Sequence, residues 1–403
     1  MRIGMILPGQ FPPDIRVEKE IRTLETEHEV SLLCLRRGKQ QANETWHGTK
    51  ITRIFNPAQR WWSQWRLMAS CHSGNWQTEI GKFIATAKPD ALHVHDLPLL
   101  GAALSVARRH RIPVVADLHE NYPAMLEDSL RAPLSQIRSL GGLVSRLSVS
   151  IDRWRQYEKD VVPQADSVIV VVEEARDRVL QLGVAPDRLY VVGNYATLDQ
   201  MPARKNEEKY TSDQSPRPTK LVYAGDFGPT RDLSTVLEAV AATSKQVADD
   251  MEVQLIGGMG RDLENLRRQA KHLGIADRVT LLQWLPRADA ERMMNEADIG
   301  LVPHVKSAHT DATIPHKLFQ YMWRKLPVIV SDCAPLERVV KESGCGVVYR
   351  SGDSQSLAQC ITSLQSSRER LGQMGEAGHA VVRQKYNWHV AGEALLRAYR
   401  KLK

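Results

Sequence analysis

The chain has 403 residues, of which 42% are hydrophobic and 25% charged, so it is too long for one compact core and is typical of a globular protein with two domains. Its net charge of +7 suits anionic substrates or a membrane surface. The sequence lacks the Lys- or Arg-rich tail that would indicate nucleic-acid binding. Five scattered cysteines argue against zinc and disulfide frameworks, and the lack of a membrane-spanning apolar run or a signal peptide favours a cytoplasmic protein.

The first half of the chain alternates strands with helices. Short apolar runs are separated by helical patterns such as 16–24, 99–109 and 173–182. This alternation indicates a parallel sheet with helices on both faces. The predicted strands are 2–7, 29–35, 91–95, 113–118, 167–172 and 190–192.

A second α/β unit follows a polar, proline-containing stretch at 201–218, which predicts a linker. The alternation restarts with strands at 220–224, 252–256, 278–282, 299–302, 328–330 and 346–349. We therefore predict an α/β protein with two Rossmann-like, doubly wound parallel-sheet domains at 1–200 and 219–385. Ligands of such sheets bind beyond the carboxyl ends of the strands, which predicts a site in a cleft where the domains face each other.

Two basic segments are candidates for a membrane contact. The insert between the second and third predicted strands holds five of the nine tryptophans: Trp46, Trp61, Trp62, Trp65 and Trp76. Its segment 60–68 combines tryptophan with arginine, and 131–159 repeats arginine near two-turn spacing. Both patterns fit an amphipathic helix on an anionic membrane. They fit equally a helix packed on the domain or a solvated helix face.

Polar residues follow several strands of the first half. Gly9 stands alone, without the Gly-x-Gly-x-x-Gly of dinucleotide sites, but would let a ligand approach the backbone. Arg16, at the start of the next helix, could bind an anion or pair with nearby acids. His95-Asp96 and the pair formed by His119 with its neighbour Glu120 end two later strands.

These histidine–acid pairs suit catalysis or acceptor binding at a cleft, although a lone histidine is more often structural. Their spacing defines no metal coordination set, so we expect no metal.

In the second half, loops after successive strands converge on one sheet edge. Gly225 and Arg231 follow the strand 220–224, and Trp284 and Leu285 follow 278–282. Glycine permits a close backbone approach, and the guanidinium can bind phosphate.

The strongest local signal is the helix that begins near Pro315, since proline suits the first helical position. The amides of His316 and Lys317, the helix dipole and the lysine charge together predict a phosphate or diphosphate site.

These motifs resemble the retaining glycosyltransferases of the GT-B fold, the glycosyl transferases group 1 family of bacterial mannosyl-, glucosyl- and N-acetylhexosaminyltransferases. The resemblance covers nearly the whole chain and implies that the last helix, 386–403, crosses back to the first domain. It rests on the segments 12–17, 117–120, 192–195, 223–225, 317–322, 327–332 and 386–388.

The resemblance implies a nucleotide-diphosphate sugar held mostly by the second domain and an acceptor held by the first. Relatives place an arginine and a lysine five residues apart after the glycine turn, where this chain has Asp226 and Arg231. At the two glutamates of the family's Glu-x7-Glu motif this chain has Ala312 and Gln320. Gln320 can still hydrogen-bond the ribose hydroxyls, whereas Asp311 would have to replace the missing group at Ala312.

The implied reaction transfers a hexosyl group with retention, and the donor's own diphosphate helps to deprotonate the acceptor. Arg231, Lys317 and the helix amides would neutralise the leaving diphosphate without a metal or other cofactor. His119 is expected near the transferred sugar, with Glu120 orienting the acceptor. The expected acceptor is lipid-linked, a polysaccharide or another glycan, in cell-envelope or exopolysaccharide synthesis in the cytoplasm or at the inner face of the plasma membrane.

Two other functions remain open. The departures at Ala312 and Gln320 also fit a non-catalytic member of the family that scaffolds a partner or a membrane. Among enzymes, a GT-B-fold nucleotide-sugar epimerase or a phosphorylase is the alternative, and an epimerase needs no acceptor.

Overall fold

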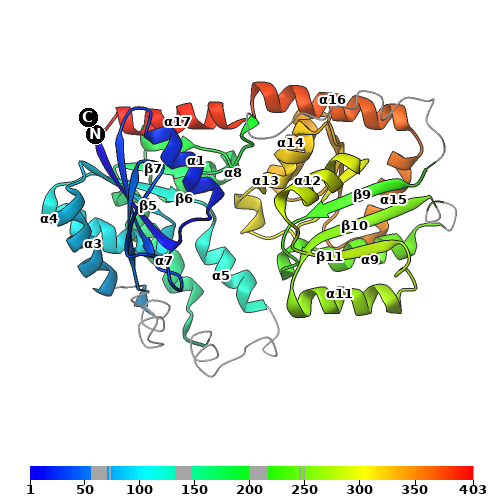
Figure 1. The fold of residues 1–403 in the computed structure, drawn as a ribbon, viewed down its shortest axis with the longest axis horizontal. Coiled ribbons are helices and arrows are strands. Elements are labelled where there is room, and N and C mark those ends of the chain that lie inside the picture. The colour runs from blue at the N-terminus through cyan, green and yellow to red at the C-terminus, as the bar shows by residue number, and fades with distance from the viewer. Residues whose placement is uncertain are drawn as a thin grey trace. The chain divides into compact units, whose positions relative to one another are not determined.

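The structure is a computed structural model that describes residues 1–55, 70–71, 74–131, 147–198, 217–244, 247 and 250–402. The chain forms two compact units (Figure 1). Unit 1 comprises Met1–Asn194 and His389–Lys403, and unit 2 comprises Tyr195–Trp388. Each unit contains one largely parallel sheet with helices around it, which confirms the predicted α/β class with two parallel-sheet domains.

The sheet of unit 1 has eight strands in the order β3-β4-β2-β1-β5-β6-β7-β8. All neighbours are parallel except β3, which is antiparallel to β4. Every residue of β5 and β6 is buried, as expected for central strands covered on both faces. The strands are β1 (Arg2–Gln10), β2 (Glu29–Leu35), β3 (Asn43–Trp46), β4 (Thr49–Ile54), β5 (Ala91–His95), β6 (Val114–Leu118), β7 (Ser167–Val170) and β8 (Leu189–Val191).

Helix α1 (Ile15–Leu24) positions the functional residues of unit 1. Asp14 caps it, because its carboxylate accepts hydrogen bonds from the amides of Arg16 and Val17 at 3.1 Å. Helix α17 (Trp388–Arg400) lies beside α1 in Figure 1, and Arg400 pairs with Glu27 at 2.6 Å. The remaining helices are α3 (Gly74–Ala87), α4 (Leu97–His110), α5 (Tyr122–Arg131), α7 (Ile151–Val161) and α8 (Glu173–Gln181).

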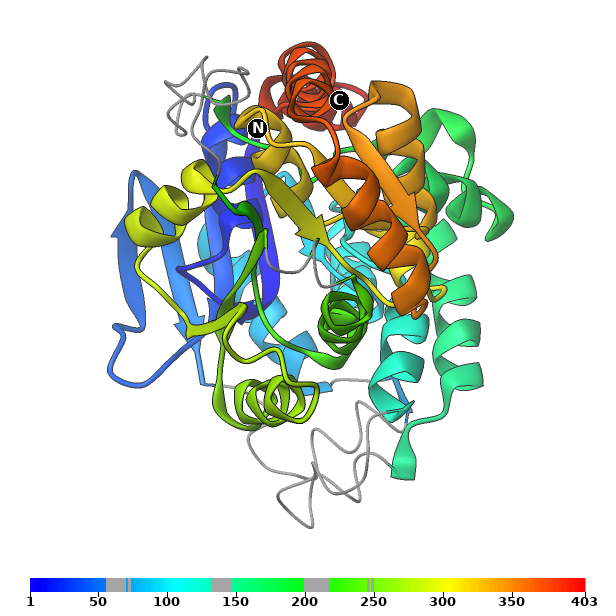
Figure 2. The same ribbon diagram turned by 90° about the vertical axis from the view of Figure 1, so that its right-hand side faces the viewer.

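The sheet of unit 2 has six parallel strands in the order β11-β10-β9-β12-β13-β14, and helices flank it in Figure 2. They are β9 (Thr219–Ala224), β10 (Met251–Gly258), β11 (Val279–Gln283), β12 (Ile299–Val302), β13 (Val328–Ser331) and β14 (Gly346–Tyr349). One apolar core joins the sheet to α9 (Leu233–Ala242), α11 (Gly260–His272) and α15 (Ser354–Gln365). The other helices are α12 (Arg287–Glu296), α13 (His316–Trp323), α14 (Ala334–Ser343) and α16 (Arg368–Gln384).

A glycine in β12 sets how closely α13 approaches the sheet. A Cβ at Gly300 would lie 2.5 Å from the ring of Tyr321, so only glycine leaves room for this side chain. The Tyr321 hydroxyl accepts a hydrogen bond from the amide of Ala224 at 2.9 Å. This contact ties α13 to the carboxyl end of β9, next to Gly225.

Several predicted features differ in the structure. Strand β1 continues to Gln10, because pairing with β2 resumes after an irregularity, so Gly9 lies in the strand and not in a following turn. Pro315 precedes α13 in an extended conformation (φ −78°, ψ 140°) and is not its first helical residue. Trp46 lies in β3 and Trp76 is buried in α3, so both lie outside the predicted amphipathic segment 60–68.

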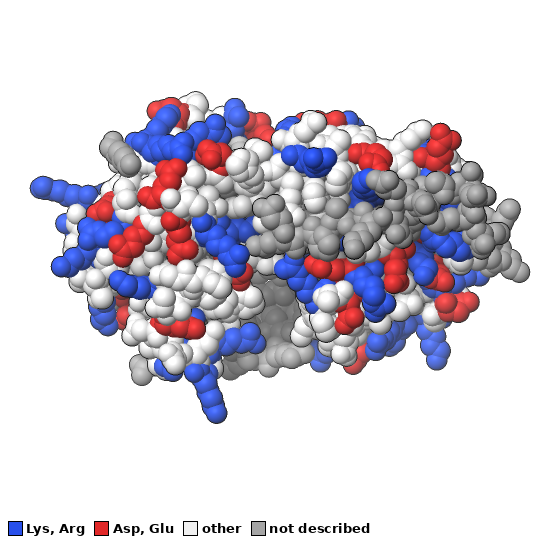
Figure 3. Space-filling model, turned by 45° about the horizontal axis from the view of Figure 1, so that its top comes forward, with Lys and Arg blue, Asp and Glu red and all other residues white. Residues whose placement is uncertain are grey.

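The proposed membrane segments fall largely outside the described residues. Trp61, Trp62 and Trp65, residues 132–146 and most of the predicted linker are among those not described. In the described part of the chain, no helix combines the length and the apolar character that a membrane span needs. On the face shown in Figure 3, basic and acidic side chains are interspersed.

We predict that Gly300→Ala destabilises the protein by about 1–3 kcal/mol, because the added methyl group would overlap the Tyr321 ring in a packed core. Differential scanning calorimetry should show a lower melting temperature. The control is Gly81→Ala in α3, where the added methyl group meets no atom within 4 Å, and it should be neutral or slightly stabilising. A Gly300→Ala variant that melts like the wild type would contradict this account of the packing.

Candidate functional site

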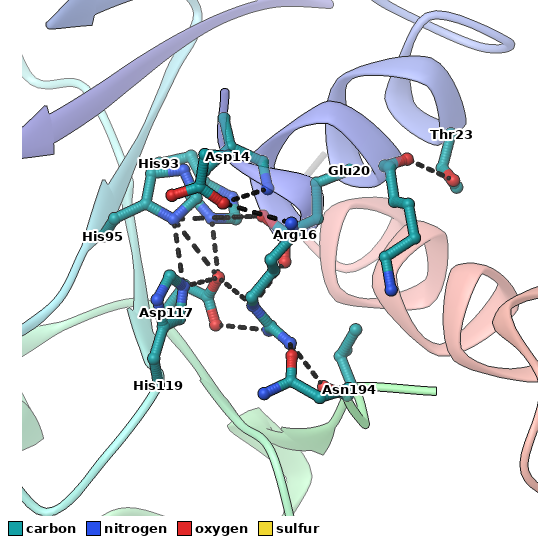
Figure 4. Close-up of polar contacts among 12 residues, drawn as sticks. Asp14, Arg16, Glu20, Thr23, His93, His95, Asp117, His119 and Asn194 are labelled. Carbon is teal, nitrogen blue, oxygen red and sulfur yellow. Dashed lines mark hydrogen bonds and ion pairs between the residues drawn. The ribbon is translucent and has the colours of Figure 1, made fainter. Parts of the chain in front are cut away.

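A buried group of charged and polar side chains lies at the carboxyl ends of β5 and β6 in unit 1 (Figure 4). Asp117, near the end of β6, is at its centre. Its Oδ1 atom pairs with Nη2 of Arg16 at 2.8 Å, and its Oδ2 atom lies 2.9 Å from Nε2 of His119. Although burial raises the pKa of Asp117, Arg16 and His119 hold it well below its usual range. The carboxylate is therefore ionised and links α1 to the residues after β6.

Arg16 is only 4% exposed, and its donors are directed at protein acceptors. Besides Asp117, its Nε lies 2.9 Å from Oε1 of Glu20. Its Nη1 donates to the carbonyl of Val192 and to Oδ1 of Asn194, both at 2.9 Å. Of the two alternatives for Arg16, the structure shows pairing with acids.

The histidines of β5 form the inner layer of this group. Nδ1 of His93 lies 2.5 Å from the hydroxyl of Tyr399, and Nδ1 of His95 lies 3.2 Å from Nε2 of His119. Burial and the neighbouring His93 lower the pKa of His95 to about 3, so this imidazole is neutral. Because His95 is fully buried, it does not line an open surface as predicted, but supports His119 from behind.

His119 is the partly exposed member of the group, with 20% of its side chain accessible. Its amide donates to Oδ1 of Asp96 at 3.3 Å, and the same oxygen lies 3.6 Å from its Nδ1. Burial lowers the pKa of His119, but Asp96 and Asp117 together raise it to about 9, so the imidazole is cationic at neutral pH. Asp96 has a positive φ of 61°, a conformation that costs a non-glycine residue about 1–3 kcal/mol. Glu120 is partly buried beside this cation.

In unit 2, the first turn of α13 carries a buried ammonium group. Nζ of Lys317 has no hydrogen-bond partner among the described residues, and it lies 3.7 Å from the ring centroid of Tyr223. Gly225 has φ +151°, and a Cβ there would overlap Nζ, so glycine makes room for this group. Burial, and then the charge of Arg231, lower the pKa of Lys317 well below its usual range. The site is suited to an anion that would restore the charge.

Asp226 changes the balance of charge next to Lys317. Its Oδ2 accepts a hydrogen bond from Nε of Arg231 at 3.0 Å and forms an ion pair with Nη2, also at 3.0 Å. Nη1 of Arg231 lies 3.4 Å from Nε2 of the buried His304. The acid at position 226 thus replaces a second cation and neutralises Arg231 instead.

The structure places the other predicted donor-binding residues at separate points of unit 2. Trp284 is 57% exposed and follows β11 with Leu285, two strands away from β9. Gln320 lies three residues after Lys317 on α13, on the same side of the helix, and His316 begins that helix. Lys317, Gly225 and Arg231 are therefore the predicted residues that this unit brings together. Gly9 belongs to unit 1.

Ala312 stands where the family's motif has its first glutamate. It is buried, and its side chain has no polar group. Asp311 accepts a hydrogen bond from the amide of Ala334 at 2.7 Å and so binds the first turn of α14. Its carboxylate is already engaged there and does not stand in for the missing glutamate in this structure.

Two residues of the unit 1 group were missed by sequence reasoning. Glu20 lies four residues after Arg16, a spacing that places both on one helix face and could have indicated the pair. Tyr399 comes from the last helix, and no local pattern predicts its contact with His93.

Replacing Arg16 by methionine should cost about 3–5 kcal/mol of stability, because it removes the guanidinium that pairs with both buried acids, Asp117 and Glu20. Urea unfolding of the purified variant measures the loss. The matched control is Arg2→Met, which breaks the exposed Arg2–Asp90 pair on the same sheet. We expect the control to unfold almost like the wild type, since exposed ion pairs contribute little. Equal effects of both substitutions would disprove the central role of Arg16.

Comparisons with known proteins agree with this architecture. Residues 205–381 match the family model described as glycosyl transferases group 1, and residues 16–195 match the glycosyl transferase 4-like domain. The chain superposes on sucrose-phosphate synthase from Thermosynechococcus elongatus with a TM-score of 0.75 and 15% identity, over 100% of this chain and 98% of the other. The corresponding values for Anabaena HepE in complex with UDP-glucose are 0.70 and 15%, over the whole of both chains.

Curated relatives are more similar in sequence. The amylovoran biosynthesis glycosyltransferase AmsK of Erwinia amylovora is 23% identical over 78% of this chain and 79% of its own length. The phosphatidyl-myo-inositol mannosyltransferase of Mycobacterium leprae is 28% identical over 42% of this chain and 43% of its own. The chain spans about half the length of the D-inositol 3-phosphate glycosyltransferases that it also matches. Together, the two family models and the two-sheet architecture show that the chain belongs to the GT-B-fold glycosyltransferases.

Proposed function

We propose that the protein transfers a hexosyl group from a nucleotide-diphosphate sugar to a polysaccharide, lipid-linked or other glycan acceptor, with retention of configuration. The observation that carries the proposal is the buried ammonium of Lys317, which lacks a hydrogen-bond acceptor among the described residues. A structural relative was solved with UDP-glucose, and curated relatives are named for amylovoran biosynthesis and for mannosyl transfer to phosphatidyl-myo-inositol. These names support the class of donor and acceptor proposed for this chain.

The donor's diphosphate fits the surroundings of Lys317. A buried cation without an acceptor is unfavourable, and a phosphate oxygen would supply that acceptor. The positive end of the α13 dipole lies at the same place and favours an anion. Because Asp226 already neutralises Arg231, we expect Lys317 to contribute more to donor binding than Arg231 does. Gln320, on the same side of α13, is the proposed partner of the ribose hydroxyls.

In the proposed reaction an acceptor hydroxyl attacks the anomeric carbon of the donor. The bond from that carbon to the diphosphate oxygen breaks, and the hydroxyl proton passes to the leaving diphosphate. Lys317 and the α13 dipole stabilise the negative charge that develops on this leaving group. The cationic imidazole of His119 is proposed to donate a hydrogen bond from Nδ1 to the transferred sugar, while Asp117 accepts from its Nε2 and Asp96 accepts from its backbone amide. No step of this scheme requires a metal ion.

Donor binding can be tested with a thermal-shift screen against UDP-, GDP- and ADP-sugars. At about 100 times its dissociation constant, a bound donor should stabilise the protein by roughly 2.7 kcal/mol. Lys317→Met should abolish the shift, and Arg231→Met should reduce it less. Lys271→Met, on the exposed face of α11, is the control and should respond like the wild type. If no nucleotide sugar shifts the wild-type protein, the donor proposal fails.

His119→Gln should lower turnover about 10²- to 10³-fold while leaving the donor-induced thermal shift intact, because it removes a charge near the sugar and not near the diphosphate. Slow hydrolysis of the nucleotide sugar, with water as acceptor, gives an assay that needs no identified acceptor. The control is His110→Gln, an exposed histidine at the end of α4.

The same assay reports the stereochemistry. NMR of the freshly released sugar should show the anomeric configuration of the donor. The inverted anomer would refute retention, and an epimerised nucleotide sugar would identify an epimerase.

A further inference from the structure

The cluster behind His119 contains four buried side chains with the chemistry of metal ligands. They come from three elements: Glu20 from α1, His93 and His95 from β5, and Asp117 from β6. One donor atom of each lies within 4.8 Å of the donor atoms of the other three. Figure 4 shows these side chains directed toward one another.

The separations of these donor atoms fit a tetrahedral ion. Bonds of about 2.0–2.2 Å to zinc place neighbouring tetrahedral ligands about 3.3–3.6 Å apart. Oδ2 of Asp117 lies 3.4 Å from Nε2 of His93 and 3.4 Å from Nδ1 of His95. Oε2 of Glu20 lies 3.6 Å and 3.9 Å from the same two nitrogens. The carboxylate-to-imidazole separations are therefore close to those of tetrahedral ligands, and the two remaining separations are at most 4.8 Å.

A second observation points to a missing cation. Glu20 is fully buried, yet neither of its carboxylate oxygens accepts a hydrogen bond of normal geometry among the described residues. Its polar contacts are the ion pair of Oε1 with Arg16, the approaches of Oε2 to the two histidines, and the neighbouring carboxylate of Asp117. A buried carboxylate in this condition is unfavourable, and a cation bound at Oε2 would relieve it.

The surroundings resemble the outer shell of a metal site. Arg16 holds the outer oxygens, Oε1 of Glu20 and Oδ1 of Asp117, and leaves Oε2 of Glu20 facing the histidines. Its Nε also lies 3.3 Å from Oδ2 of Asp117, so this oxygen would be shared. Tyr399 fixes Nδ1 of His93, which leaves Nε2 directed at the carboxylates. Groups that orient ligands in this way typically support metal affinity.

We propose that Glu20 Oε2, His93 Nε2, His95 Nδ1 and Asp117 Oδ2 bind one divalent transition-metal ion, for which two imidazoles and two carboxylates in tetrahedral arrangement favour Zn²⁺. The ion would not contact the sugar donor. It would replace the contact between His95 Nδ1 and His119 Nε2, and it would fix Asp117, whose Oδ2 lies 2.9 Å from His119 Nε2 and so holds His119 in position. This inference concerns unit 1 and does not depend on the proposed donor site.

The test uses the full-length protein, stripped with a chelator and then dialysed against Zn²⁺ or Co²⁺. After desalting, elemental analysis should find one ion per chain, and the Co²⁺ form should show the visible absorption of a tetrahedral complex. Reloading with Zn²⁺ should also raise the melting temperature of the stripped protein. X-ray absorption of the Zn²⁺ form should show imidazole scattering, which tests the ligands without any substitution.

Two variants test the assignment. Glu20→Gln and His95→Gln should each weaken binding by more than about tenfold, the lower limit typical of outer-shell changes. His110→Gln removes an exposed imidazole and should bind metal like the wild type. The proposal is overturned if the stripped wild type takes up no stoichiometric ion, or if folded Glu20→Gln and His95→Gln keep wild-type affinity. A failed metal test would leave the thermal shifts with nucleotide sugars unchanged, so the two proposals can be judged separately.

Discussion

The ion pair between Arg16 and Asp117 is the interaction on which unit 1 depends. It joins the first helix to a central strand, and the same guanidinium reaches the chain after β8 through Val192 and Asn194. Arg16 and Asp117 are both buried, so losing one of them would leave the other charge poorly solvated. The imidazole of His119 hydrogen-bonds the same carboxylate. The Arg16–Asp117 ion pair therefore also fixes the position of His119, the proposed catalytic side chain.

In unit 2, glycines make room for the side chains of the candidate site. Gly300 lets the Tyr321 ring approach β12, and the Tyr321 hydroxyl then binds the end of β9. Gly225 leaves the volume that the Lys317 ammonium occupies. Burial lowers the pKa of Lys317 beside the Tyr223 ring, and a bound anion would favour the charged form of its amino group. The same residue in solvent would bind phosphate with less selectivity.

Parts of both sites could be predicted because parallel strands end at one edge. This rule brings His119 to Asp96 and Lys317 to Gly225, although many residues separate each pair in sequence. It does not tell whether an arginine at such an edge meets a ligand or another side chain, because that depends on acids from other elements. Glu20 and Tyr399 reach the cluster from the first and last helices. The short β3–β4 pair was missed because β3 is polar and mostly exposed, and because two of the three buried residues of β4, Thr49 and Arg53, are polar, which leaves no apolar pattern.

Neighbouring carboxylates distinguish Arg16 and Arg231 from Lys317. Each arginine follows the first strand of its sheet. Arg16 is balanced by two buried carboxylates, and Arg231 by Asp226. Among the described residues, the Lys317 ammonium has no carboxylate as a hydrogen-bond partner. It lies instead over the face of the Tyr223 ring. An anionic substrate gains most where the protein has left a cation uncompensated, since it need not displace an internal carboxylate first. The proposed anion site is therefore the start of α13, while the two guanidinium groups pair with carboxylates of the protein itself.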